Sequence, residues 1–256
     1  MDRVNENLIY EAFRKFLTKS LRPLDEETVH VGEVVSCLRK SFYSRRFGNK
    51  ELTHLEKTKF IILGLGLSTH LVLEEILKEL GCTTEFTQVG TIITKDYEIK
   101  IAGTPDAYND KFVIEIKTVN RIPEKPYRHH LMQLNAYLWL THRRIGYIVY
   151  IEKKTGRVKV FEHTFNDELH DEFIRRAIKY YEAIKYNITP EREETWLCNY
   201  CEWKFMCYES KAKESKKKGL NNFEGKNEYG DRKNERPEKN NNNRKRRNIS
   251  ATRGAF

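Results

Sequence analysis

The sequence predicts an α/β fold with a mixed central sheet, because the hydrophobic period of the chain changes several times along its length. Helical spacing of apolar residues dominates up to about residue 80. A stretch rich in Thr, Ile, Val and aromatic residues then runs from Thr83 to Val119, as expected for strands. With 256 residues, 39% of them hydrophobic, the chain is long enough for one sizeable domain with its own core.

Helices are expected before the strands. Residues 31–48 are predicted to start as a short extended segment and to continue as a helix that ends near Gly48. Residues 55–80 show a long helical pattern that Gly81 closes. Residues 5–21 place apolar side chains at helical spacing, namely Leu8, Ile9, Ala12, Phe13, Phe16 and Leu17.

Three strands are expected between residues 83 and 119, where turn residues separate the β-branched runs. Residues 126–144 return to helical spacing, and residues 145–165 predict a β-hairpin around Lys154-Thr155-Gly156. A last helix is expected over residues 166–187, with Asn166 as its N-cap. A segment with three cysteines follows.

The positive charge is concentrated at the C-terminal end. The formal net charge is +10, and residues 211–256 carry 15 basic against 6 acidic residues, whereas residues 1–210 carry 32 against 31. Large aliphatic residues are almost absent from this end, so we expect a folded domain over residues 1–209 and a basic disordered tail over residues 210–256. Such a tail suits contact with nucleic acid, and a solubilising extension is an equal alternative.

The cysteine content bears on the compartment. No stretch of the sequence is expected to span a membrane, and the N-terminus lacks the apolar core of a signal peptide, so we expect a cytoplasmic protein with no membrane partner. Structural disulfides are rare in the cytoplasm. Five cysteines in that compartment indicate metal binding more than bridging.

The run "GTPDAYNDKFVIEIKTV" carries the clearest chemistry. Alternate side chains share a face of a strand, so Glu115 and Lys117 point together, away from the apolar side. A hairpin through "YNDK" would bring Asp106 to Glu115. Paired carboxylates suit Mg²⁺ or Mn²⁺, and a neighbouring lysine can orient water or neutralise charge on a phosphate. An ordinary surface Glu–Lys pair is the alternative, and the upstream "GTPD" weighs against it.

Three cysteines gather in "CNYCEWKFMC", at positions 198, 201 and 207. Since no histidine follows them in the sequence, a fourth ligand has to come from elsewhere, and Cys37 is the natural candidate. Cys82 is expected to be a turn or core residue. Four thiolates suit either Zn²⁺ or an iron–sulfur cluster, and spacing alone leaves both open.

The segment "RKSFYSRRF", next to Cys37, interleaves cations and aromatic side chains. Single-strand binding proteins use this combination, because aromatic rings stack on bases and cations meet phosphates. The equal alternative is an amphipathic helix whose aromatic residues are core. The candidate DNA-binding residues are Arg39, Lys40, Tyr43, Arg45 and Arg46.

The ordered set of motifs resembles the PD-(D/E)xK nuclease superfamily. Within it, the chain is similar to the CRISPR-associated, RecB-like nucleases that carry an iron–sulfur cluster. "GTPD" and "EIK" match the superfamily signature, "GLSTH" (66–70) precedes the strands, and "QLNAY" (133–137) follows them. One cysteine near the N-terminus and three near the C-terminus complete the match, over roughly residues 30–208. The resemblance implies a restriction-endonuclease-like core with helices flanking a mixed sheet, plus a cysteine-ligated cluster region.

The resemblance also implies roles for matching residues. One departure is that relatives often follow the motif histidine with a glutamate, where this chain has Leu71; Glu74 shares the helix face of His70 and is a candidate replacement. Ligands of Mn²⁺ or Mg²⁺ would be His70, Asp106, Glu115 and the backbone carbonyl of Ile116. Catalytic residues would be Lys117, Glu115, Asp106, Gln133 and Tyr137. A [4Fe–4S] cluster would be held by Cys37, Cys198, Cys201 and Cys207, with Zn²⁺ as the alternative.

The activity implied is that of a metal-dependent DNA exonuclease that hydrolyses phosphodiesters at single-stranded ends, with 5′-to-3′ polarity as the first expectation. Its implied task is the processing of DNA for CRISPR spacer acquisition, with single-stranded DNA and the CRISPR integrase proteins as partners; a homo-oligomer is compatible with the sequence. A nuclease of repair or recombination outside CRISPR is one alternative. A non-catalytic, metal-stapled nucleic-acid-binding subunit is another, although such a subunit has no need for the intact Asp106, Glu115 and Lys117 set.

Overall fold

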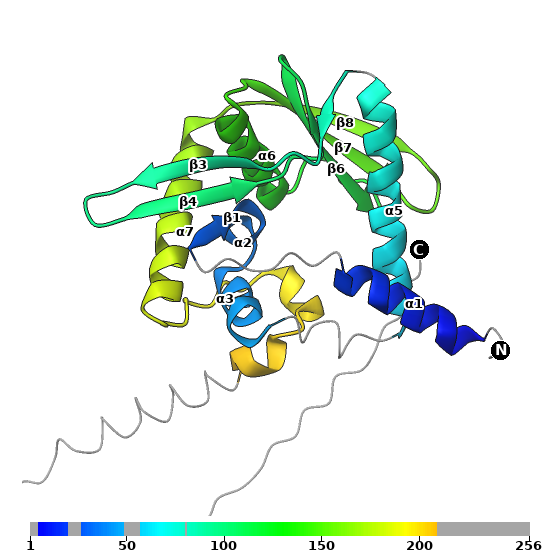
Figure 1. Cartoon of the computed structure of the whole chain (residues 1–256), viewed down its shortest axis with the longest axis horizontal. Coiled ribbons are helices and arrows are strands. Elements are labelled where there is room, and N and C mark those ends of the chain that lie inside the picture. The colour runs from blue at the N-terminus through cyan, green and yellow to red at the C-terminus, as the bar shows by residue number, and fades with distance from the viewer. Residues whose placement is uncertain (1–4, 20–26, 49–56, 80, 209–256) are drawn as a thin grey trace, which may run out of the picture. The chain divides into compact units, whose positions relative to one another are not determined.

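The fold is seen in a computed structural model, which describes residues 5–19, 27–48, 57–79 and 81–208 (Figure 1). The expected basic tail lies outside these ranges, so the division at residue 209 stays a prediction. The described chain is a mixed α/β fold, as predicted. Its helical elements are α1 (Glu6–Lys19), α2 (Val31–Val35), α3 (Leu38–Phe47), α5 (Lys57–Glu79), α6 (Arg128–Thr141), α7 (Asp167–Lys185) and the 3₁₀ turn η1 (Trp196–Tyr200).

The described strands form two mixed sheets. One has the order β1-β4-β3 and the other the order β2-β5-β6-β7-β8. The β1–β4 and β6–β7 pairs are parallel, and the remaining pairs are antiparallel. The strands are β1 (Thr28–His30), β2 (Thr83–Thr84), β3 (Gln88–Ile93), β4 (Glu98–Gly103), β5 (Ala107–Tyr108), β6 (Phe112–Val119), β7 (Ile145–Glu152) and β8 (Val158–Thr164).

The later elements match the sequence predictions closely. Strands β7 and β8 form the expected hairpin. The side chain of Asn166 caps α7 by accepting a hydrogen bond of 2.8 Å from the backbone N–H of Leu169. Gly81 follows α5 with a φ of 77°, and its N–H donates to Lys78 while the N–H of Cys82 donates to Leu77, which is the Schellman arrangement.

Two local predictions were wrong. The extended segment precedes Val31 instead of following it, because Glu33 accepts a hydrogen bond of 2.9 Å from the His30 N–H and so starts α2. The region 83–119 holds five strands and not three. The additional strands β2 and β5 are two residues long each, and the single expected sheet is divided into two.

Helix α6 lies at the centre of the main hydrophobic core. It contacts both sheets as well as α2 and α7, and its buried side chains include Leu134, Ala136 and Leu138. The close approach of α6 to β4 depends on Gly103: a Cβ atom there would lie 2.7 Å from Tyr137 Cε1 and 2.9 Å from Leu140 Cδ1. The glycine of "GTPD" therefore brings the "QLNAY" helix against the strand that leads to Asp106.

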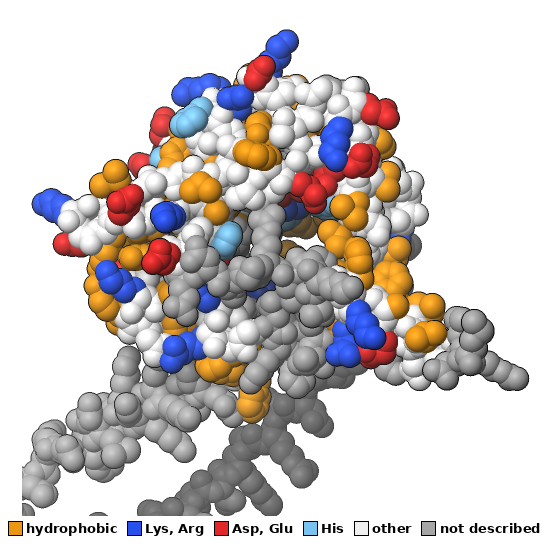
Figure 2. Space-filling model, viewed as in Figure 1, with side chains coloured by type: hydrophobic (Ala, Val, Ile, Leu, Met, Phe, Trp, Pro, Cys, Tyr) orange, Lys and Arg blue, Asp and Glu red, His pale blue; other side chains and the backbone are white. Residues whose placement is uncertain are grey.

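Helix α5 corrects the expectation that no stretch could span a membrane. Its segment Phe60–Glu79 is long and apolar enough to do so by length and composition, although one such helix is weak evidence. Hydrophobic side chains follow α5 and α1 at the right of Figure 2. The exposed ones on α5 are Ile62, Leu63, Leu65, Leu71, Val72 and Ile76. The same helix carries the polar residues His70 and Glu74.

Candidate active site

A hairpin brings Asp106 to strand β6. Asn109 forms the turn by accepting hydrogen bonds from the N–H groups of Lys111 and Phe112, at 2.9 and 3.1 Å. The resulting register pairs Ala107 with Ile114. Asp106 Oδ2 then accepts a hydrogen bond of 2.6 Å from the Ile116 N–H. The predicted approach of Asp106 to this strand is therefore present in the structure.

Glu115 and Lys117 share one face of β6, as the alternation of the strand predicts. Glu115 is 2% exposed, and its Oε1 accepts a hydrogen bond of 2.5 Å from Lys117 Nζ. Burial raises the pKa of the Glu115 carboxyl, and the adjacent Lys117 ammonium opposes this effect. The second oxygen, Oε2, is buried with no partner among the described residues. An unsatisfied buried carboxylate oxygen of this kind fits the donor set of a cation.

Helix α6 holds the lysine from the other side. Gln133 Oε1 accepts a hydrogen bond of 3.0 Å from Lys117 Nζ, and Gln133 Nε2 donates to Tyr137 OH at 3.0 Å. Gln133 and Tyr137 are one helical turn apart, so both reach the same side of α6. Glu115, Lys117, Gln133 and Tyr137 thus form one continuous hydrogen-bonded chain, which joins the "EIK" and "QLNAY" motifs.

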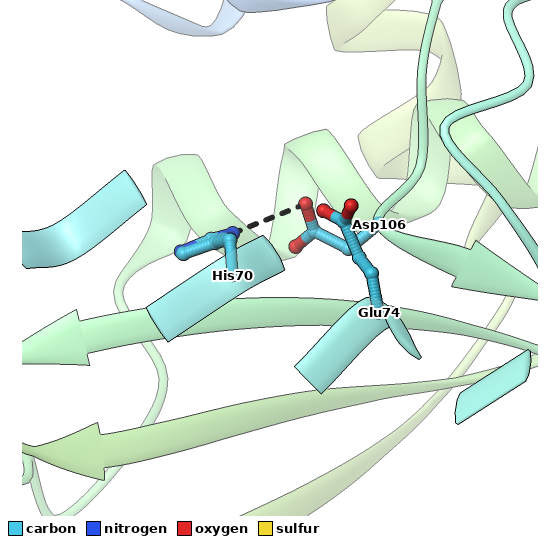
Figure 3. Close-up of side chains that lie close together, drawn as sticks. All are labelled: His70, Glu74 and Asp106. Atoms are coloured by element: carbon cyan, nitrogen blue, oxygen red, sulfur yellow. Dashed lines mark hydrogen bonds and ion pairs between the residues drawn. The ribbon is translucent and has the colours of Figure 1, made fainter. Parts of the chain in front are cut away.

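His70 and Glu74, both on helix α5, lie next to Asp106 (Figure 3). One ligand atom from each of these three residues lies within 4.8 Å of the other two. His70 Nδ1 is 3.3 Å from Asp106 Oδ1, and this hydrogen bond raises the pKa of the imidazole. Burial, followed by the charges of Glu85 and Asp106, raises the pKa of Glu74 to about 7. Crowded acidic groups whose pKa values rise in this way favour a bound cation.

The structure makes Glu74 a stronger candidate for a metal ligand than the sequence alone did. Among the described residues, the group that converges on Asp106 contains His70 and Glu74, whereas Glu115 is directed to Lys117. The i, i+4 spacing after His70 was the signal in the sequence. The arrangement offers an imidazole, carboxylate oxygens and a positioned ammonium, which suits metal-assisted attack on a phosphodiester.

Four partly buried cysteines line the cavity that also contains Lys117 and Gln133. Cys37, Cys198, Cys201 and Cys207 all contribute to one cavity of about 610 Å³, and none of them forms a disulfide. Burial raises the pKa of Cys201, and the nearby Cys37 adds to this effect. Cys82 lies instead in a separate apolar cluster with Ala107, as expected for a core residue. Among the described residues, the groups of three or more ligand atoms that lie within 4.8 Å of one another contain none of these cysteines.

The structure places most of the candidate DNA-binding residues of α3 in the interior. Arg39 is 8% exposed, and its Nε donates to the Pro190 carbonyl at 2.7 Å. Tyr43 is 5% exposed and packs against Trp203. Arg39 and Tyr43 are therefore part of the protein core, as in the alternative interpretation of this helix, and are not available to DNA in this structure.

Arg45 is also engaged within the protein. Its guanidinium binds both carboxylate oxygens of Glu33, at 3.0 and 2.7 Å, and this accounts for its burial. Lys40 is partly exposed and forms an ion pair with Glu202 at 3.1 Å. Arg46 is exposed. Lys40 and Arg46 therefore remain the candidates for DNA contact from this helix.

The motif order and the assembled site agree with a comparison to known families. The family described as the PD-(D/E)XK nuclease superfamily matches residues 22–208. The chain belongs to this superfamily. Nucleases of the superfamily use divalent cations, and the His70, Glu74 and Asp106 group is a possible site for one.

Two similar proteins narrow the comparison. The CRISPR-associated exonuclease Cas4 of Saccharolobus solfataricus is 31% identical over 189 residues, which are 72% of this chain and 88% of the relative. The crystal structure of SSO0001 matches with a TM-score of 0.63 at 27% identity, covering 80% of this chain and 96% of that one. The resemblance to CRISPR-associated nucleases stated from the motifs is thus confirmed, as is the expectation of a DNA exonuclease.

Proposed function

We propose that this nuclease is a divalent-metal-dependent exonuclease that degrades single-stranded DNA from its 5′ end, in the cytoplasm, for CRISPR spacer acquisition. The observation that carries the proposal is the convergence of Asp106, Glu115 and Lys117 from a hairpin and a strand, with His70 from α5. The similarity to a CRISPR-associated exonuclease supports the CRISPR context. The 5′-to-3′ polarity and the single-stranded substrate follow the resemblance.

The chain's own residues suit a cation site. His70 and Asp106 would hold the cation together with Glu74, which lies beside them, and with the unpartnered Oε2 of the buried Glu115. The Ile116 carbonyl is a further candidate, because the N–H of the same residue faces Asp106 and both groups project to one side of a strand. A bound Mn²⁺ or Mg²⁺ supplies Lewis acidity toward the scissile phosphate and the attacking water.

Lys117 would act on the phosphate directly. Its ammonium is fixed by Glu115 and Gln133, so a positive charge is held in one position on the face of β6. A preorganised charge of this kind stabilises negative charge that develops on the phosphate oxygens in the transition state. Gln133 and Tyr137 would keep the lysine oriented and face the DNA backbone.

The four cysteines would hold a [4Fe–4S] cluster, with Zn²⁺ as the alternative. All four cysteines line one cavity, and the resemblance to iron–sulfur nucleases supports the cluster. Such a cluster would join Cys37, at the start of α3, to the C-terminal segment that already packs on α3 through Trp203 (Figure 1). Iron, sulfide and zinc content of the purified protein distinguishes the two centres.

Two associations belong to the same proposal. Contact with CRISPR integrase proteins is proposed from the similarity to the Cas4 exonuclease. Self-association is proposed because α5 exposes Ile62, Leu65, Val72 and Ile76 at spacings of three, seven and four residues along one stripe. Light scattering of the full chain tests the second, and a single monomeric species would contradict it.

Digestion of end-labelled single-stranded DNA tests the activity. We expect shortening with Mn²⁺ that EDTA abolishes, and early release of a 5′ label while a 3′ label remains on long fragments. Early release of the 3′ label would contradict the polarity. Binding without cleavage in both Mn²⁺ and Mg²⁺ would favour the non-catalytic subunit, and matched RNA and duplex DNA substrates test the preference for single-stranded DNA.

A further inference from the structure

A row of aromatic side chains, in which Tyr127 is half-buried and the other two are exposed, lies beside the N-terminus of α6. Tyr127 packs with its ring nearly parallel to that of His129, at an interplanar angle of 16° and 5.7 Å between centroids. Trp196 packs on Tyr127 at 5.9 Å, and Tyr200 follows Trp196 at 6.3 Å. Trp196 is 57% exposed and Tyr200 is 80% exposed. We refer to Tyr127, Trp196 and Tyr200 as the aromatic row.

The aromatic row adjoins the catalytic lysine. His129 and Tyr200 line the same cavity as Lys117 and Gln133. Tyr127 is the N-cap residue of α6, the helix that carries Gln133. Of the row itself, Tyr200 lines this cavity, and Trp196 lies between two further lining residues, Thr195 and Leu197, so the row borders the cavity that contains the Lys117 ammonium.

The charge around the row favours a polyanion. Cations that line the cavity include Lys40, Lys117, Arg128, Arg192 and Lys204. Two glutamates, Glu172 and Glu193, line it as well, so the cations outnumber the acidic residues of the lining. Most of these cations form ion pairs with carboxylates: Lys40 with Glu202, Lys117 with Glu115, Arg128 with Glu172 and Arg192 with Glu194. Burial lowers the pKa of His129, so its ring is neutral near pH 7 and stacks as an uncharged aromatic group.

We propose that the aromatic row is a stacking platform for the unpaired bases of the DNA substrate, next to the phosphate held at Lys117. This rests on the proposed function, because it assumes a single-stranded substrate. Aromatic rings stack on all bases, each base contributing roughly 1–3 kcal/mol, so a platform binds single strands with little sequence preference. Duplex DNA, whose bases are already stacked, gains nothing from it.

The row thereby selects the kind of DNA end that reaches the lysine. Both Trp196 and Tyr200 lie in η1, a short turn that leaves their rings largely open to solvent. Replacing an exposed ring removes few contacts within the protein. Their substitution is therefore expected to change DNA binding without unfolding the domain.

Equilibrium binding in EDTA, which prevents cleavage, tests the platform. The probes are a single-stranded oligonucleotide and one of the same length with abasic sites. We expect the wild-type protein to bind the intact strand about tenfold more tightly, the value of one to two stacked bases. Trp196→Ala and Tyr200→Ala are each expected to reduce this preference several-fold, whereas Trp196→Phe retains most of it.

Phe205 provides the matched control. It is 72% exposed in the same C-terminal segment, and among the described residues it has no ring contact with the aromatic row, so Phe205→Ala is expected to leave the preference unchanged. Equal binding of both probes by the wild-type protein, or an unchanged preference in both Trp196→Ala and Tyr200→Ala, would overturn the platform while leaving the nuclease intact. Absence of wild-type binding to either probe would instead overturn the proposed single-stranded substrate together with the platform.

Discussion

Gln133 accepts a hydrogen bond of 3.0 Å from the ammonium of Lys117. The bond joins helix α6 to strand β6, and a second bond from Gln133 to Tyr137 fixes the orientation of the amide. A lysine ammonium carries three rotatable donors on a flexible stem, so one partner alone does not define its position. Glu115 and Gln133 together hold the charge where a phosphate can meet it.

Gln133→Ala is therefore expected to lower kcat about ten- to a hundred-fold, because a misplacement of about 1 Å at a reacting group costs on that order. DNA affinity should change little. Initial rates and single-strand binding, measured on the same preparation, separate the two effects.

Gln88→Ala is the matched control for this variant. Gln88 also donates its amide to a tyrosine hydroxyl, that of Tyr108 at 3.0 Å, but it lies on β3 and outside the proposed site. We expect near wild-type kcat for Gln88→Ala. Equal rates in both variants would show that Gln133 has no special role in catalysis.

Glu74→Gln tests whether this residue helps to hold the cation. The substitution keeps the shape of the side chain and removes its charge next to His70 and Asp106, so Mn²⁺ affinity is expected to fall about tenfold. Calorimetric titration of the full chain with Mn²⁺ measures it. Glu75, on the same helix with a side chain 72% exposed, gives the control Glu75→Gln, and identical Mn²⁺ affinities in the two variants would remove Glu74 from the site.

Gly103→Ala is expected to destabilise the domain by about 1–3 kcal/mol, because the added methyl group would lie 2.7–2.9 Å from Tyr137, Val31 and Leu140. Urea unfolding measures the change. A Cβ atom added at Gly32 in α2 would have nothing within 4 Å, so Gly32→Ala should be neutral or stabilising, by about 0.4–1 kcal/mol. Wild-type stability in Gly103→Ala would mean that α6 does not pack this closely on β4.

His130 predicts a loss of stability in acid. Burial lowers its pKa to about 3, with Lys117 and His129 adding to the effect, and its Nδ1 lies 2.7 Å from Tyr150 OH. In the unfolded chain the pKa is near 6.5. Between these two values the unfolded state binds a proton that the folded state does not, so stability falls as the pH falls from about 6.5 toward 3.

His130→Asn removes this titration and should flatten the acid limb of stability against pH by up to about 1.4 kcal/mol per pH unit. His142→Asn is the control: His142 is exposed, and its left-handed backbone, with a φ of 56°, suits asparagine. Urea unfolding at several pH values measures both. The same acid limb in His130→Asn and in the wild type would contradict the prediction.

Cys201→Ala is expected to lower the melting temperature of the domain by several degrees and to abolish bound iron and sulfide, since a cluster that joins two ends of a chain contributes to folding. Calorimetry and metal analysis of the purified variant measure the two effects. Cys82→Ala is the control, because it removes a buried thiol from a separate hydrophobic core cluster, and this variant should retain the bound metal. An unchanged melting temperature in Cys201→Ala would count against a structural role.

Local pattern was sufficient to predict the hairpin part of the site. The period of two in a strand fixed the common face of Glu115 and Lys117, and the turn residues fixed the approach of Asp106, because both depend on neighbours within a dozen positions. The proximity of Glu74 to Asp106 was harder to predict. It depends on how α5 packs beside the sheet, and that is a tertiary relation.

Helix α3 shows the same limit. Its alternating cations and aromatic residues suit DNA and suit a core equally well, and the partners that decide between them are distant in the sequence. Arg39 binds a carbonyl 151 positions away, and Tyr43 packs on Trp203. Arg45 pairs with Glu33, which belongs to the preceding helix. The aromatic row likewise combines Tyr127 with a segment about 70 residues later, so no local sequence motif predicts it.

Lys117 is proposed to serve a metal-dependent nuclease site, and the rate of single-stranded DNA digestion by Lys117→Ala in saturating Mn²⁺ tests this role. The wild-type and variant proteins should first show the same melting temperature and the same DNA affinity within a few-fold. We expect a loss of at least about a hundredfold in rate, comparable to removing a preorganised charge from an active site. Wild-type digestion by the folded variant would contradict it.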